Sequence, residues 1–151
     1  MRIFSRTEWL ISIVLAVGLI QLTPVIGWYY ASTTPVQEWI DVSKVYVTDT
    51  KLGDVVQVVV SRTIHQSFDG SYSVKVIRID GDSRFPICDN SNDVHYTPKD
   101  GTIALTLDQY LSEACSLPTG LYIVETTWIV KREGYGDKSL TVESNPFKVF
   151  K

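Results

Sequence analysis

Residues 117–130 read LPTGLYIVETTWIV, and this stretch decides the fold of the chain. From Tyr122 to Val130 every second residue is apolar or β-branched. Side chains alternate between the two faces of a β-strand, so this period of two predicts a long strand with one buried face. The buried face would carry Tyr122, Val124, Thr126, Trp128 and Val130. Gly134-Tyr135-Gly136-Asp137 predicts the turn that ends it.

Further short strands are predicted on both sides of this stretch. They cover residues 42–48, 54–64, 72–76, 102–107 and the C-terminal residues 140–149. Turn signals separate them at Phe68-Asp69-Gly70-Ser71 and Asp80-Gly81-Asp82. The only helical pattern in this region covers residues 107–114, with Asp108 placed to cap it. About seven short strands with regular turns predict a mainly β protein, an antiparallel β-sandwich.

The segment 117–128 resembles the entry into strand F of immunoglobulin-like and fibronectin-III-like domains. In those domains a turn with glycine precedes a tyrosine that packs at the corner, and Tyr122 holds that place. The ending SNPFKV at 144–149 is similar to the last strand of bacterial and phage Ig-like modules. No cysteine lies two residues after Tyr122, so the resemblance implies an Ig-like sandwich and no particular family.

The N-terminal segment predicts a single transmembrane α-helix. Residues 9–30 carry no charge and have aromatic residues at both ends, and about 20 apolar residues cross a bilayer as a helix. Gln21, Thr23 and Pro24 are its weak points. A cleaved signal peptide is the competing reading, but small residues are poorly placed for cleavage. The expected partner of residues 9–30 is therefore a lipid bilayer.

The charge asymmetry around this segment predicts an orientation. Arg2 and Arg6 precede the span and no Lys or Arg follows until Lys44, which places the N-terminus in the cytoplasm. The expected organisation is a cytoplasmic segment 1–8, a signal-anchor helix 9–30, a linker 31–41 and an Ig-like ectodomain 42–151. The location would be the inner or plasma membrane, with a periplasmic or extracellular C-terminal domain.

The chain has two cysteines, Cys88 and Cys115. An even count in an exported domain predicts one disulfide bond, whereas two buried thiols would be expected in a reducing cytosol. A loop of this length gives about 3.5 kcal/mol of stabilisation in the chain-entropy model. We expect the disulfide, which agrees with the orientation of the N-terminal segment.

The composition argues against two classes of protein. The net charge is −3 and no basic run occurs, so nothing neutralises the phosphates of a nucleic acid. Catalysis by a serine or cysteine needs a histidine base, and only His65 and His95 are present, neither near a G-x-S-x-G motif. We therefore expect a protein that is not an enzyme and that has no cofactor.

One acidic stretch weakly resembles a calcium-binding loop. Asp89, Asp93 and Asp100 would supply oxygen ligands at loop positions, but Val94 stands where a glycine is needed. A solvated acidic loop explains the stretch better than a metal site does.

The loops are the remaining candidates for function. Tyr135 lies between two glycines at a turn, and Phe68 and Phe85 lie at or near other turns. Tyrosine supplies rigid, amphipathic contact area in Ig-like binders. These features predict a non-catalytic, membrane-anchored Ig-like module that binds another protein or is an accessory subunit of an envelope complex. The alternative is a phage-encoded or virion-associated membrane protein acting in lysis, superinfection exclusion or assembly.

Overall fold

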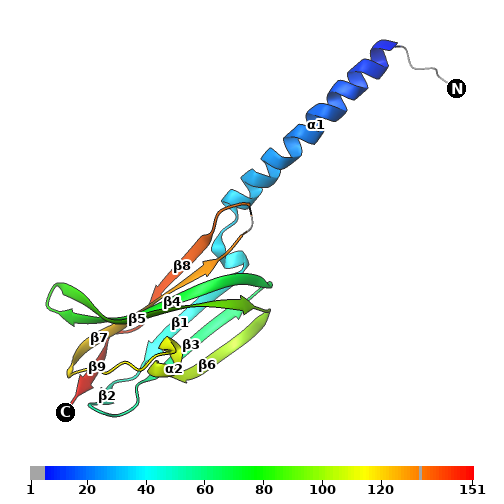
Figure 1. Cartoon of the computed structure of the whole chain (residues 1–151). Helices are drawn as coiled ribbons and strands as arrows, with labels where there is room; N and C mark the ends of the chain where they lie inside the picture. Colours follow the sequence, from blue (N-terminus) through cyan, green and yellow to red (C-terminus); the bar gives the residue numbers. More distant parts are fainter. Residues whose placement is uncertain (1–5, 133) are drawn as a thin grey trace. The chain divides into compact units, whose positions relative to one another are not determined.

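The computed structural model describes residues 6–132 and 134–151, and it divides into two compact units (Figure 1). The first unit ends at Thr34 and the second runs from Pro35 to Lys151. The division falls inside the predicted linker 31–41. The helix of the first unit extends to Thr33 and the first strand of the second begins at Ile40. Each unit is described by itself below.

The first unit is the helix α1, Arg6–Thr33. Pro24 lies inside it, and the hydroxyl of Thr23 donates to the carbonyl oxygens of Leu19 and Ile20 at 3.1 and 2.8 Å. The predicted transmembrane helix 9–30 is wrong. Among the residues that the structure describes, no helix combines the length and the apolar character needed to cross a bilayer. The polar residues Gln21 and Thr23 and the proline interrupt the apolar residues of α1. Residues 1–5 of the predicted cytoplasmic segment 1–8 lie outside the described residues.

The second unit is mainly β, as predicted. Its elements are η1 (Val36–Glu38), β1 (Ile40–Val47), β2 (Thr50–Lys51), β3 (Gln57–Ile64), β4 (Phe68–Asp80), β5 (Ser83–Tyr96), β6 (Lys99–Thr106), α2 (Leu107–Leu111), β7 (Gly120–Val130), β8 (Lys138–Glu143) and β9 (Phe147–Phe150). One sheet has the strand order β1-β3-β6, and the other has the order β2-β9-β7-β4-β5, with β8 also paired to β7. All pairs are antiparallel except β2–β9.

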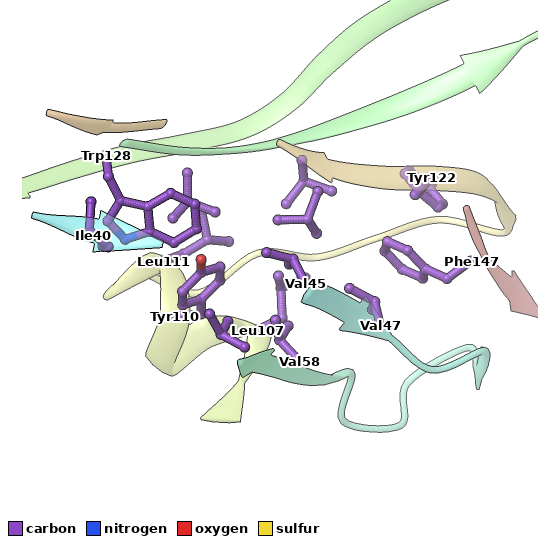
Figure 2. Packing of buried hydrophobic residues seen from close by; sticks show 14 of the residues in the cluster. Ile40, Val45, Val47, Val58, Leu107, Tyr110, Leu111, Tyr122, Trp128 and Phe147 are labelled. Atoms are coloured by element: carbon purple, nitrogen blue, oxygen red, sulfur yellow. The ribbon is translucent and has the colours of Figure 1, made fainter. Parts of the chain in front are cut away.

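The hydrophobic core lies between the two sheets, and β7 supplies much of it (Figure 2). All five residues of the predicted buried face of β7 are buried, with Trp128 at 1% exposure. Across the gap, Val45, Val47 and Val58 come from β1 and β3. Burying one such aliphatic side chain contributes about 1.5–3 kcal/mol. The alternation of β7 is thus the main sequence signal for the core.

Tyr122 forms a side-chain bond that fixes the entry into β7. Its hydroxyl donates to the carbonyl oxygen of Pro118 at 2.7 Å, four residues upstream. The ring is fully buried and lies 5.7 Å from the ring of Phe147. A Cβ at Gly120 would lie 3.2–3.4 Å from atoms of this ring and its hydroxyl. The glycine therefore leaves room for the tyrosine to close over the turn.

The predicted turn at residues 68–71 is wrong, because these residues belong to β4. Phe68 is buried and stacks on Tyr96 at 4.6 Å between ring centroids. A Cβ at Gly70 would collide with the carbonyl oxygen of Ile129 in the neighbouring strand β7. The Asp-Gly pair thus marks a close approach of two strands, which the sequence pattern does not distinguish from a hairpin turn.

The polar segment around Asp89–Asp93 was expected to be a loop, but it forms part of β5. β5 lies at the edge of its sheet and pairs only with β4 among the described strands. Polar and charged residues suit an edge strand because they prevent pairing with other chains. The segment lacks the alternating apolar residues that predict a strand because it lies at the edge of the sheet.

The short helix α2 confirms the helical pattern, but its cap differs from the prediction. The N-cap is Thr106, which forms a capping box with Gln109. Asp108 instead accepts a hydrogen bond from the backbone N–H of Cys115 at 3.0 Å. The helix ends at Leu111 because Ser112 adopts a left-handed conformation with φ 57°.

The disulfide bond between Cys88 and Cys115 is present, as predicted. Cys88 lies on β5 and Cys115 follows α2. A second contact joins the same elements, because the side-chain amide of Asn90 donates to the carbonyl oxygen of Leu111 at 2.6 Å. The bond therefore ties the edge strand to the segment that crosses between the sheets.

Candidate functional site

The connection between β7 and β8 presents an aromatic side chain at one end of the sandwich. Gly134 and Gly136 have φ angles of 79° and 74°, a conformation that non-glycine residues rarely adopt. Tyr135 lies between them and is 47% exposed. The two glycines thus allow a tight turn that holds a tyrosine outward.

Arg132 organises this turn from within. Its guanidinium group donates to the carbonyl oxygens of Gly136 at 3.2 Å and Tyr135 at 3.0 Å. Its backbone N–H donates to the carboxylate of Asp137 at 3.3 Å. These bonds span the turn, so one side chain fixes the backbone on which Tyr135 stands.

The same guanidinium group contacts two aromatic rings. It lies 5.3 Å from the ring centroid of Trp39 and 5.9 Å from that of Tyr135. Cation–π contacts of this kind contribute about 0.5–1 kcal/mol at exposed sites. Trp39 follows η1 at the start of the second unit, Pro35–Lys151, which we call the β unit. We call Trp39, Arg132 and Tyr135 the tip cluster.

An exposed ion pair and an exposed histidine–carboxylate contact lie beside the tip cluster at the ends of β4, β5 and β7. Lys131 donates to Asp93 at 2.8 Å, and this hydrogen bond raises the pKa of the lysine. Nδ1 of His95 lies 2.7 Å from the carboxylate of Asp69. All four side chains are largely exposed, so solvent screens these pairs and they add little stability.

The sequence-predicted loop residues do not gather in one place. Phe68 is 6% exposed inside β4, so it is not available at a loop tip. Phe85 is 51% exposed on β5, where it pairs with Arg78 beside Tyr122. Tyr135 follows Val130, at the other end of β7. Of the three candidates, only Tyr135 lies on an organised loop.

Neither histidine belongs to a recognisable catalytic set. His65 follows β3, and its backbone N–H donates to the carbonyl oxygen of Trp39. His95 contacts Asp69, and within residues 6–132 and 134–151 no hydroxyl or thiol is hydrogen-bonded to either imidazole ring. A nucleophile–base pair needs such a bond.

The three acidic candidates for calcium binding are separated by the fold. Asp89 and Asp93 lie on β5 in one sheet, and Asp100 lies on β6 in the other. Among the residues that the structure describes, no group of three or more potential metal ligands occurs.

Sequence reasoning identified Tyr135 but missed its two partners. Trp39 was placed in the linker 31–41, yet its neighbours Val36 and Ile40 are buried in the core. Arg132 gave no signal in the sequence, because its role depends on the path of the turn. The Gly-Tyr-Gly pattern was the only available indicator of this site.

No protein-family model and no curated protein matches the sequence. Among solved structures, the chain is weakly similar to a Listeria innocua β-glucosidase in complex with gluconolactone, at a TM-score of 0.38 and 12% identity. That match covers 74% of this chain and 16% of the enzyme. The CARDB domain of a Pyrococcus furiosus protein, in complex with di-metal ions, matches at a TM-score of 0.36 and 12% identity, over 76% of this chain and 97% of that domain. At TM-scores this low, these similarities do not indicate a function for this chain.

Proposed function

We propose that the β unit is a non-catalytic, Ig-like binding module that contacts another protein through the tip cluster. The observation that carries the proposal is the turn around Tyr135. Tyr135 is an exposed aromatic residue in a turn whose backbone is held by Arg132, which donates hydrogen bonds to two carbonyl oxygens of the turn. A group fixed before binding loses less conformational entropy when a partner arrives.

The chemistry of the tip cluster suits a protein partner. Tyrosine, tryptophan and arginine are the residue types most enriched at binding hot spots, and the tip cluster contains one of each. Tyrosine also has few rotatable bonds for its contact area. The exposed ion pair Lys131–Asp93 and the exposed contact between His95 and Asp69 would form a polar rim beside it.

The Ig-like assignment is supported by the corner at the start of β7. The bond from Tyr122 to the carbonyl oxygen of Pro118 corresponds to the tyrosine corner of such domains. In Ig-like binders the turn at the opposite end of strand F is a common contact site, and Tyr135 lies in the corresponding turn after β7.

We further propose that the module works outside the cytoplasm. A disulfide bond persists in oxidising compartments and is rare in the reducing cytosol. The Cys88–Cys115 bond supports this location.

The proposal is tested by capturing partners with the full-length chain from the cells that carry it. Wild-type, Tyr135→Ala and Tyr135→Phe chains are compared by quantitative mass spectrometry. We expect one protein to be enriched by the wild-type chain and retained by the Phe variant. The Ala variant should weaken the interaction about 30-fold, the usual loss at a hot spot.

Phe85→Ala is the matched control, because Phe85 is similarly exposed at the other end of the sheet. It should leave capture unchanged. Equal capture by wild-type and Tyr135→Ala chains would contradict a role for the tip cluster. Recovery of no protein, with binding of a glycan or small ligand instead, would contradict the proposed class of partner.

A further inference from the structure

A cavity of about 180 Å³ opens between the two sheets, and no residue of the tip cluster lines it. Strands β3 and β6 contribute one wall and β4, β5 and β7 the other, with α2 closing part of it. The lining residues include Arg62, Tyr72, Tyr96, Leu105, Tyr110 and Trp128. Its surface is therefore mainly aliphatic and aromatic, with a single charged side chain.

The aromatic walls are fixed by their own contacts. The rings of Tyr72 and Tyr110 stack at 6.2 Å between centroids. The hydroxyl of Tyr110 donates to Thr126 at 2.9 Å, so it is already satisfied. Figure 2 shows Tyr110 and Trp128 in the core between the sheets. These residues form a rigid apolar lining.

Two polar groups of the cavity lack a conventional partner. The hydroxyl of Tyr96 is shielded from solvent, and its hydrogen has no acceptor among the described residues. The polar group beside it is the guanidinium of Arg62, which can only donate. Arg62 lies 5.4 Å from the centroid of the Tyr96 ring, and no described acidic side chain forms an ion pair with it. A buried hydroxyl and a guanidinium group normally find an acceptor in a folded protein.

The hydroxyl stays protonated at neutral pH. Burial raises the pKa of Tyr96 to about 12, although the positive charge of Arg62 acts in the opposite direction. The cavity therefore offers the Tyr96 hydroxyl as a hydrogen-bond donor and the positive charge of Arg62, within a lining that is mainly apolar.

We propose that this cavity binds a small monocarboxylate with an apolar, aromatic body, of the size of benzoate. A carboxylate oxygen beside Arg62 supplies the acceptor that the guanidinium group and the Tyr96 hydroxyl lack. The ring of the ligand packs against Tyr72, Tyr110 and Trp128. This site is independent of the proposed protein-binding function.

The volume and charge restrict the class of ligand. A cavity of about 150 Å³ with apolar walls accommodates benzene, so about 180 Å³ leaves room for one ring and little more. One arginine matches the single negative charge of a carboxylate and pairs with it in a bidentate geometry. A phosphate carries more charge than this lining neutralises.

The test measures binding of sodium benzoate to the full-length chain by NMR chemical-shift titration at neutral pH, with benzyl alcohol as the neutral analogue. We expect benzoate to shift signals of the lining residues and to bind more tightly than benzyl alcohol. Arg62→Gln should weaken benzoate binding about tenfold or more, the usual cost of losing a charged hydrogen bond, and leave benzyl alcohol unaffected. Tyr96→Phe should weaken benzoate binding about threefold.

Arg84→Gln is the matched control, because Arg84 is an exposed arginine that pairs with Glu143 outside the cavity. It should bind benzoate as the wild-type chain does. Leu105→Phe, which fills the cavity without changing its charge, should abolish binding of both compounds. The proposal is overturned by absence of benzoate binding up to about 10 mM, a concentration well above a weak millimolar affinity. Equal affinities for benzoate and benzyl alcohol, or equal benzoate binding by wild-type and Arg62→Gln chains, would also overturn it.

Discussion

The corner at Tyr122 gives the most quantitative prediction about the fold. Tyr122→Phe removes the hydroxyl that donates to the carbonyl oxygen of Pro118 at 2.7 Å and keeps the buried ring. A hydrogen bond of this kind contributes about 0.5–1.5 kcal/mol net. We expect the free energy of unfolding to fall by about 1 kcal/mol. For a β unit that runs from Pro35 to Lys151, the melting temperature should fall by about 3–6 °C.

The assay is urea unfolding of the full-length chain followed by circular dichroism, with Tyr46→Phe as the matched control. Tyr46 is 38% exposed, so its variant should stay within about 0.5 kcal/mol of wild type. If the Tyr122→Phe variant is as stable as the wild-type chain, the hydrogen bond from Tyr122 to Pro118 does not stabilise the fold and the prediction is refuted.

A double-mutant cycle with Gly120→Ala makes the same prediction more specific. The added Cβ would lie 3.3 Å from the Tyr122 hydroxyl, so part of its cost comes from that atom. We therefore expect Gly120→Ala to cost less in the Tyr122→Phe background than in wild type. Equal costs in both backgrounds would mean that the glycine and the hydroxyl do not interact.

Three further predictions concern other parts of the β unit. Replacing Cys88 and Cys115 together by serine should lower the free energy of unfolding by about 3.5 kcal/mol, measured by urea unfolding; a loss below about 1 kcal/mol would contradict the loop-entropy reasoning. Gly70→Ala should destabilise the chain by more than about 2 kcal/mol, because its methyl group meets the carbonyl oxygen of Ile129, and an unchanged melting temperature would exclude that close approach. The raised pKa of Tyr96 stabilises the fold fully below pH 10. That contribution, on the order of 2 kcal/mol, should be lost as the pH rises from 10 to 12. Alkaline unfolding curves of wild-type and Tyr96→Phe chains that keep a constant difference over this range would contradict it.

The parts of the fold that sequence reasoning recovered have strong local patterns. The period-two alternation of β7 predicts a buried face, and the structure confirms it at every second position from Tyr122 to Val130. The disulfide followed from an even cysteine count. Both features depend on few residues and little tertiary context.

The errors arose where tertiary context decides. β5 carries polar residues because it is an edge strand, and a position in a sheet cannot be read from a single strand. Asp69-Gly70 has the composition of a turn, but Gly70 is needed because a side chain there would collide with the backbone of β7. The error at the N-terminal segment has a different, local cause. Residues 9–30 have the length of a membrane span, but Gln21, Thr23 and Pro24 interrupt their apolar character.

The candidate sites were less predictable than the fold. Tyr135 was found because two glycines flank it, whereas Arg132 and Trp39 join it only after the chain has folded. The cavity beside Arg62 and Tyr96 is formed by strands from both sheets, so no local pattern indicates it. Both the tip cluster and the cavity are formed by contacts between segments that are distant in the sequence.

Site-specific photo-crosslinking tests the binding role of the tip cluster most directly. A photoreactive phenylalanine replaces Tyr135, Phe85 or Leu52 in turn in the full-length chain, and adducts are identified after irradiation of intact cells. All three side chains are exposed, and Leu52 lies near the end of β9, at the other end of the sandwich. The account predicts one protein adduct at position 135 that is absent at 85 and 52. The same adducts at all three positions, or none at 135, would contradict it.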